Sequence, residues 1–195
     1  MTLRERFDGC IWGDFQATGL DVDYRIEKAG PVSRVFLQGT ESLQDVLLDA
    51  KFQAVQYDRG FKVHRGIAEG YASARDKLLA ELADAQAVEV QGWSLGAAYA
   101  LLLHYDLQFR VAVRGFGFGT PAILWWTPKV VRARFGQFTR ITLRGDPFAQ
   151  GWLPPRLLGY QHAGREVTIG EPAPLDAFAR HGDITAYQRE LDRLE

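Results

Sequence analysis

The sequence predicts an α/β fold with a mostly parallel central sheet and helices on both faces, in a single domain that spans residues 1–195. Short runs of β-branched and aromatic residues alternate with longer stretches of helical periodicity, which is typical of this class. The 195 residues, 47% of them hydrophobic, are enough to bury one sizeable core. The sequence contains no repeat, low-complexity tract or polar linker that would divide the chain.

Four runs have the composition of strands and are bounded by Gly, Pro or charged residues: 32–38, 87–91, 110–116 and 138–144. Between them, apolar residues near helical spacing predict a helix over 67–83, and a stretch rich in Leu and Ala predicts another over 94–107. Strands that alternate with helices indicate a parallel sheet. Ligands of such sheets bind beyond the carboxyl ends of the strands, so we expect the site there.

The charge and the cysteine count exclude several classes of function. The formal net charge is -1, from 23 basic and 24 acidic residues, so no broad positive field attracts nucleic acid, and a small neutral substrate fits better. The single cysteine, Cys10, cannot form an internal disulfide. The four histidines are scattered and show no metal-ligand spacing, so we expect neither a metal nor an organic cofactor.

The first fifteen residues are charged and lack the apolar run of a signal peptide. No stretch of about eighteen apolar residues is present either, so a membrane-spanning helix is not expected. We therefore expect a soluble, cytoplasmic protein, although a non-Sec export route would need no such signal.

The strongest motif is Gly92-Trp93-Ser94-Leu95-Gly96, which follows the strand 87–91 directly and opens the helix 94–107. In a nucleophile elbow of the α/β-hydrolase type, the Ser lies at a strained strand-to-helix turn, and Gly residues on either side let the two elements pass closely. The alternative is an N-capping Ser in a Gly-rich turn. The position between strand and helix favours the nucleophile.

A serine nucleophile needs a histidine base, which follows it in the chain order of elbow enzymes. His64 precedes Ser94, and His104 lies about 15 Å further along the same predicted helix. His162 and His181 remain. We expect His162 inside a strand, whereas His181 lies at a junction between a loop and a terminal helix, a position that suits a base better.

The acid of the triad is expected between nucleophile and base. Asp146 follows the strand 138–144 directly and precedes Pro147, so it lies at the carboxyl end of a strand. That position makes it the candidate acid.

Several blocks together resemble the class 3 lipases, the fungal-lipase-like family of α/β hydrolases. They occur in the family's order along most of the chain: VFLQGTES, KVHRGIAEGY, VQGWSLGAAYA, RGFGFGTP, TLRGDPFAQGWLPP and YQHAGREVTI. The resemblance makes His64 and His162 structural. The chain is short for the family, and Trp93 stands where the family usually has His.

The resemblance also assigns roles to five residues. It implies Ser94 as nucleophile, Asp146 as acid and His181 as base. It further implies that Thr40, after the strand VFLQG, stabilises the oxyanion with its backbone N–H and its hydroxyl. The backbone N–H of Leu95 is the second expected donor.

The resemblance implies a serine esterase or lipase that hydrolyses acylglycerol-like, other lipid or short acyl esters through an acyl-enzyme. Two alternatives stay open: an acyltransferase or thioesterase on the same triad, and an inactive hydrolase fold used as a binding module. The sequence does not indicate an oligomeric state.

Two segments bear on contact with lipid. Trp125 and Trp126 lie where the family often has Arg-Val-Gly-Asn, and they either meet a lipid surface or a partner, or close the core. Residues 41–51 carry one apolar stripe at helical spacing. This segment is either a surface helix fixed against the core or a lid over Ser94.

Overall fold

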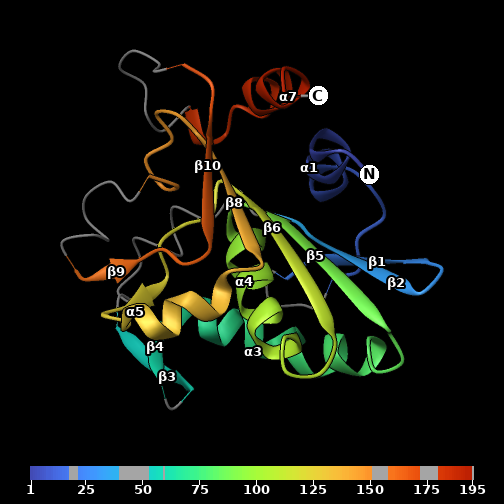
Figure 1. The fold of residues 1–195 in the computed structure, drawn as a ribbon, viewed down its shortest axis with the longest axis vertical. Helices are drawn as coiled ribbons and strands as arrows, with labels where there is room; N and C mark the ends of the chain where they lie inside the picture. Colours follow the sequence, from blue (N-terminus) through green and yellow to red (C-terminus); the bar gives the residue numbers. More distant parts are fainter. Residues whose placement is uncertain (18–21, 40–52, 59, 151–157, 172–179, 195) are drawn as a thin grey trace.

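The computed structural model describes residues 1–17, 22–39, 53–58, 60–150, 158–171 and 180–194. Ten strands and six helices of these residues take part in the fold (Figure 1). The strands are β1 (Tyr24–Ala29), β2 (Val32–Leu37), β3 (Ala54–Asp58), β4 (Phe61–His64), β5 (Ala87–Trp93), β6 (Ala112–Phe118), β7 (Leu124–Trp125), β8 (Phe138–Leu143), β9 (Tyr160–Gln161) and β10 (Arg165–Ile169). The helices are α1 (Leu3–Ile11), α3 (Arg65–Glu81), α4 (Leu95–Leu107), α5 (Lys129–Arg132), a 3-10 turn (Ala133–Phe135) and α7 (Ile184–Asp192).

The main sheet has six strands in the order β1-β2-β5-β6-β8-β10. All of its pairs are parallel except β1 with β2. The mostly parallel sheet expected from the sequence is therefore confirmed. A second sheet, β3-β4-β7-β9, is antiparallel and was not expected, because its strands are short and two of them have only two residues.

Helices cover both faces of the main sheet, as predicted (Figure 1). On one face, α3 and α4 bury the larger apolar cluster, and α4 is apolar on every side because it lies in the centre of that cluster. On the other face, α1 and α7 pack over a smaller cluster that includes Phe7, Phe118, Ile141, Leu143 and Tyr187. Side chains along β8 point alternately to the two faces of the sheet, so Phe138 lies in the first cluster and Ile141 in the second.

The four predicted strands all exist, with shifted ends. The run 110–116 becomes β6 two residues later, because the N–H groups of Arg110 and Val111 still bond to the Leu107 carbonyl at the end of α4. The terminal helix begins at Ile184 and not at His181, because Asp183 caps it by accepting a 2.9 Å hydrogen bond from the Ala186 N–H. The prediction that His162 lies inside a strand is also wrong, since this residue lies between β9 and β10.

Candidate active site

Ser94 lies between the end of β5 and the first residue of α4, at the carboxyl edge of the sheet. Its backbone has φ 56° and ψ -121°, a left-handed conformation that a non-Gly residue adopts only under strain. A Cβ on Gly92 would lie 2.3 Å from the Gly96 carbonyl oxygen, and one on Gly96 would lie 2.3 Å from the Leu37 oxygen. The two glycines of the motif are therefore required by the close approach of strand and helix.

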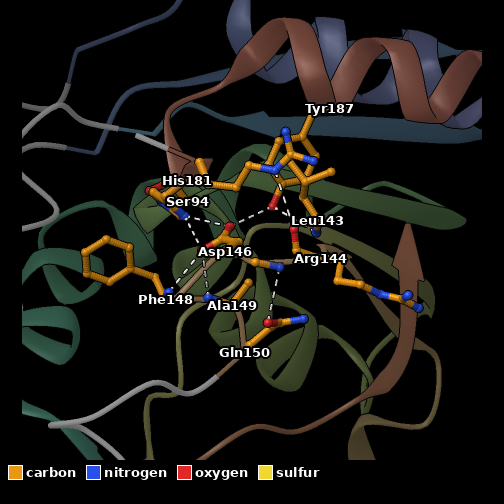
Figure 2. A network of polar contacts seen from close by, with 11 residues as sticks. Ser94, Leu143, Arg144, Asp146, Phe148, Ala149, Gln150, His181 and Tyr187 are labelled. Carbon is orange, nitrogen blue, oxygen red and sulfur yellow. Dashed lines mark hydrogen bonds and ion pairs between the residues drawn. The ribbon is translucent and has the colours of Figure 1, made fainter. Parts of the chain in front are cut away.

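Three side chains meet at this turn (Figure 2). The Ser94 hydroxyl lies 2.7 Å from Nε2 of His181, and Nδ1 of His181 lies 2.8 Å from Oδ2 of Asp146. Ser94 and His181 are 87 residues apart in the sequence. All three side chains are buried. The structure thus brings together the three residues that the sequence singled out, in the order of a nucleophile, a base and an acid.

The Asp146 carboxylate is held by further donors on its other sides. Its Oδ1 accepts hydrogen bonds from the backbone N–H groups of Phe148 at 3.0 Å and Ala149 at 3.1 Å. Its Oδ2 accepts a 2.8 Å hydrogen bond from the Tyr187 hydroxyl (Figure 2). Burial and the neighbouring carboxylate raise the pKa of Tyr187 well above its ordinary value, so the phenol stays protonated and donates.

Tyr187 was not found from the sequence. It lies on the predicted terminal helix, six residues after His181, but helical periodicity shows only that such a residue faces the core. No pattern indicates which carboxylate its hydroxyl reaches.

The imidazole of His181 is packed between two aromatic rings. Trp93 stacks on it with the ring centroids 6.1 Å apart and 15° between the planes, and Phe148 meets it edge-on at 4.8 Å. A Cβ on Gly119, whose φ is +62°, would lie 3.1 Å from Cε1 of His181. The ring is therefore fixed in the plane that points at Ser94 and Asp146.

The three other histidines lie elsewhere. His64 is buried at the end of β4, and its ring lies 5.5 Å from that of Tyr160. His104 is buried on α4 between Phe135 and Phe138. Burial lowers the pKa of both His64 and His104 to about 4, so both are neutral at physiological pH. His162 follows β9 and lines a pocket that does not include Ser94.

Two residues were expected to stabilise the oxyanion. One of them, Leu95, follows Ser94 directly in the sequence, is the first residue of α4 and is buried. Thr40 lies outside the described residues, as does the segment 41–51 that was considered as a lid. Gly39, the last described residue before Thr40, lies close to the elbow, because a Cβ on Gly39 would lie 3.1 Å from the Ser94 Cβ.

Trp125 and Trp126 were expected either to meet a lipid surface or a partner, or to close the core, and the structure differs for the two residues. Trp125 is partly buried in β7, and its indole N–H donates a 2.9 Å hydrogen bond to the Leu158 carbonyl. Trp126 is 65% exposed. Of this pair, therefore, only Trp126 presents a large apolar surface to solvent.

No group of three or more His, Cys, Asp or Glu side chains within the described ranges has an arrangement that could hold a metal ion.

The fold, with a hydrogen-bonded Ser, His and Asp at the carboxyl edge of its parallel strands, is that of an α/β hydrolase. Residues 34–152, more than half of the chain, match the family described as lipase (class 3). The chain belongs to this family, which confirms the resemblance found in the sequence.

Characterised relatives are fungal lipases. A lipase of Rhizomucor miehei is 29% identical over 159 residues, which are 72% of this chain and 42% of the relative. A secreted mono- and diacylglycerol lipase of Malassezia globosa is 31% identical over 159 residues, 69% of this chain and 51% of the relative. The chain thus spans about half the length of these relatives.

Solved structures have the same fold. The triacylglyceride lipase of Rhizomucor miehei superposes with a TM-score of 0.68 at 24% identity, over 81% of this chain and 66% of that one. The Lip2 lipase of Yarrowia lipolytica gives a TM-score of 0.63 at 22% identity, over 83% of this chain and 68% of that one.

The expectation of a cytoplasmic protein is wrong. Relatives from Malassezia globosa and Malassezia restricta are named secreted lipases, which contradicts that expectation. In the part of the chain that the structure describes, no helix has the length and apolar character needed to cross a membrane.

Proposed function

We propose that this chain is a secreted serine hydrolase that cleaves carboxylic esters of lipids, with Ser94 as nucleophile, His181 as base and Asp146 as acid. The observation that carries the proposal is the unbroken series of hydrogen bonds from Ser94 through His181 to Asp146. Acylglycerols are the substrate class that the names of the relatives indicate, and shorter acyl esters share the same reacting group. We also propose that residues 1–195 act as one domain, because α1 and α7 share one apolar cluster.

The geometry supports acyl transfer in two steps. His181 removes the Ser94 proton as the hydroxyl attacks the ester carbonyl, and the resulting imidazolium then protonates the leaving alcohol. Water, deprotonated by the same imidazole, releases the acid from the acyl-enzyme. Asp146 holds the imidazole in the tautomer that accepts at Nε2, and it stabilises the imidazolium. No step requires a metal or an organic cofactor.

The oxyanion of the tetrahedral intermediate needs two donors close to Ser94. We propose the backbone N–H groups of Leu95 and Thr40 for this role. The position of Leu95 at the start of α4 supports its part, since the dipole of that helix also favours negative charge there. The family resemblance alone supports the part of Thr40.

A fluorophosphonate probe, which reacts covalently with an activated serine, tests the proposal. We expect labelling of the wild type, none of Ser94→Ala, and a large loss in His181→Ala, with all three proteins folded by circular dichroism. Ser73→Ala is the matched control, because Ser73 is an exposed serine on α3, and it should label normally. An unlabelled wild type would instead support the inactive binding module.

Hydrolysis and transfer to another acceptor share this triad and label alike. A panel of acylglycerols, p-nitrophenyl esters and thioesters, assayed with and without an added alcohol, separates them. Release of free acid from the esters supports the proposal, whereas transfer to the alcohol in preference to water supports the acyltransferase.

A further inference from the structure

A pocket of about 690 Å³ lies away from the three candidate catalytic residues, none of which lines it. Its walls come from β8, β9, β10, α5 and the adjoining connections. Figure 1 shows β9 and α5 on the side of the molecule where β10 forms the edge of the main sheet. The side chains with polar or charged groups in this wall include Arg132, Arg140, Gln161, His162 and Glu166.

Arg140 is the central feature of the pocket because it is charged and only 5% exposed. It alternates with Ile141 on β8 and so projects to the face opposite α1 and α7. Its Nη2 lies 3.5 Å from the Glu166 carboxylate, which is a long and partly solvated contact. Its Nε and Nη1 have no hydrogen-bond partner among the described residues.

A buried guanidinium with unpaired N–H groups is costly unless an acceptor reaches it. Burial lowers the pKa of Arg140 in spite of Glu166, so this one carboxylate does not offset the loss of solvent. Arg132, on α5, adds a second cation to the same wall, and its Nε is also buried without a partner in the described chain. The wall of the pocket therefore has two guanidinium groups and one carboxylate, which leaves an excess of positive charge and of donors.

We propose that this pocket binds a phosphate group. Nε and Nη1 of Arg140 carry three N–H bonds that point in different directions, and Arg132 adds another from a separate element. A phosphate accepts from one edge of the Arg140 guanidinium and, through a further oxygen that points away from that edge, from Arg132, whereas a carboxylate has only two oxygens in one plane and usually pairs with one edge of a single guanidinium. Gln161 supplies a further donor, since its oxygen already accepts from the Thr127 N–H at 3.1 Å and its amide nitrogen remains. The volume is within the range of small-molecule sites, so the phosphate has room for an attached alcohol.

The phosphate comes either free from solution or on the headgroup of a phospholipid. The site does not depend on the proposed catalysis, because it shares none of the groups that would perform it. Ser94→Ala should therefore bind phosphate like the wild type, and a failure of one proposal leaves the other standing.

Calorimetric titration of the full chain with inorganic phosphate, at constant ionic strength, tests the site. We expect saturable binding at one site. Arg132→Gln should weaken it roughly tenfold or more, the effect of losing one charge-assisted hydrogen bond. Arg140→Gln should abolish it, and if that variant does not fold, Arg132→Gln carries the test. Arg134→Gln removes the same charge from an exposed residue two positions along the chain and should leave binding unchanged.

Sedimentation with vesicles separates the two sources. Phosphatidylcholine vesicles that contain phosphatidic acid are compared with vesicles that contain oleic acid, which carries a negative charge without a phosphate. Retention on the phosphatidic acid vesicles alone, reduced by Arg132→Gln and by free phosphate, identifies the headgroup. Binding of free phosphate without such retention identifies the soluble anion. The proposal is wrong if the wild type gives no saturable phosphate binding, if acetate binds equally tightly, or if Arg134→Gln weakens binding as much as Arg132→Gln.

Discussion

The hydroxyl of Tyr187 donates a 2.8 Å hydrogen bond to Oδ2 of Asp146, the same oxygen that lies 2.8 Å from Nδ1 of His181. Tyr187 also stacks on Phe7 of α1, with ring centroids 5.3 Å apart. The packing of α1 against α7 therefore fixes the phenol, and the phenol fixes the carboxylate. In the proposed mechanism Tyr187 is a positioning residue, because it would act on the ester only through Asp146 and His181.

Tyr187→Phe should lower kcat roughly tenfold with little change in KM, since a hydrogen bond to a charged group contributes about 1.5–3 kcal/mol and this one orients the acid rather than the substrate. Steady-state kinetics with a soluble p-nitrophenyl ester measures both constants. Tyr24→Phe is the control, because Tyr24 lies on β1, away from the site, and its hydroxyl donates a 3.0 Å hydrogen bond to the Glu81 carboxylate on α3. Equal kcat values for the two variants would remove Tyr187 from the positioning of Asp146.

Asp146→Asn should lower kcat by about 10³- to 10⁴-fold, because an amide neither stabilises the imidazolium nor enforces the tautomer that Ser94 needs. The fold should persist, since an Asn oxygen still accepts from the Phe148 and Ala149 N–H groups. Asp183→Asn is the comparison, because Asn caps α7 about as well as Asp does, and it should stay active. Turnover of Asp146→Asn close to that of Asp183→Asn would point to a different acid.

Gly96→Ala should destabilise the protein by several kcal/mol, because the new Cβ would lie 2.3 Å from the Leu37 carbonyl oxygen and backbone cannot move as a side chain can. Gly30→Ala separates this clash from conformational strain, since Gly30 has φ +62° with open space around it. That variant should lose only about 1–2 kcal/mol, the left-handed penalty of an L-residue. Urea unfolding of both measures the difference, and equal losses would contradict the close contact of β2 with α4.

Acid should destabilise the fold through His64 and His104. Burial lowers the pKa of each to about 4, below the ordinary value of 6.5, so the unfolded chain binds more protons between these two values. The free energy of unfolding is therefore highest above pH 6.5, falls as the pH drops from 6.5 to 4, and stops falling on their account below 4. Each histidine contributes a slope of at most about 1.4 kcal/mol per pH unit.

His104→Leu should flatten this dependence, because it removes one of the two groups and leaves the packing against Phe135 and Phe138 apolar. Denaturant unfolding of the variant and the wild type at several pH values between 4 and 7 measures the two slopes. If the slopes are the same, His104 is protonated as easily in the folded protein as in the unfolded one.

The sequence determined the features of this protein that depend on neighbouring residues. The elbow at Ser94 could be predicted from the sequence because the two glycines that it requires lie within five residues of each other, where α4 follows β5. The strands of the parallel sheet could be predicted because each is a short run rich in β-branched and aromatic residues, bounded by Gly, Pro or charged residues. Asp146 could be predicted as the acid because it follows one of these strands directly.

Only the tertiary structure decided which distant groups meet. Position alone gave His181 a modest preference over His162, and the family resemblance assigned the base; the structure places the His181 ring 2.7 Å from Ser94 across 87 residues. The second sheet, the hydroxyl of Tyr187 on Asp146 and the buried Arg140 gave no signal in the sequence. Helical or strand periodicity reports whether a side chain is buried, but a hydrogen bond between separate elements depends on how those elements pack, and packing is a property of the whole chain.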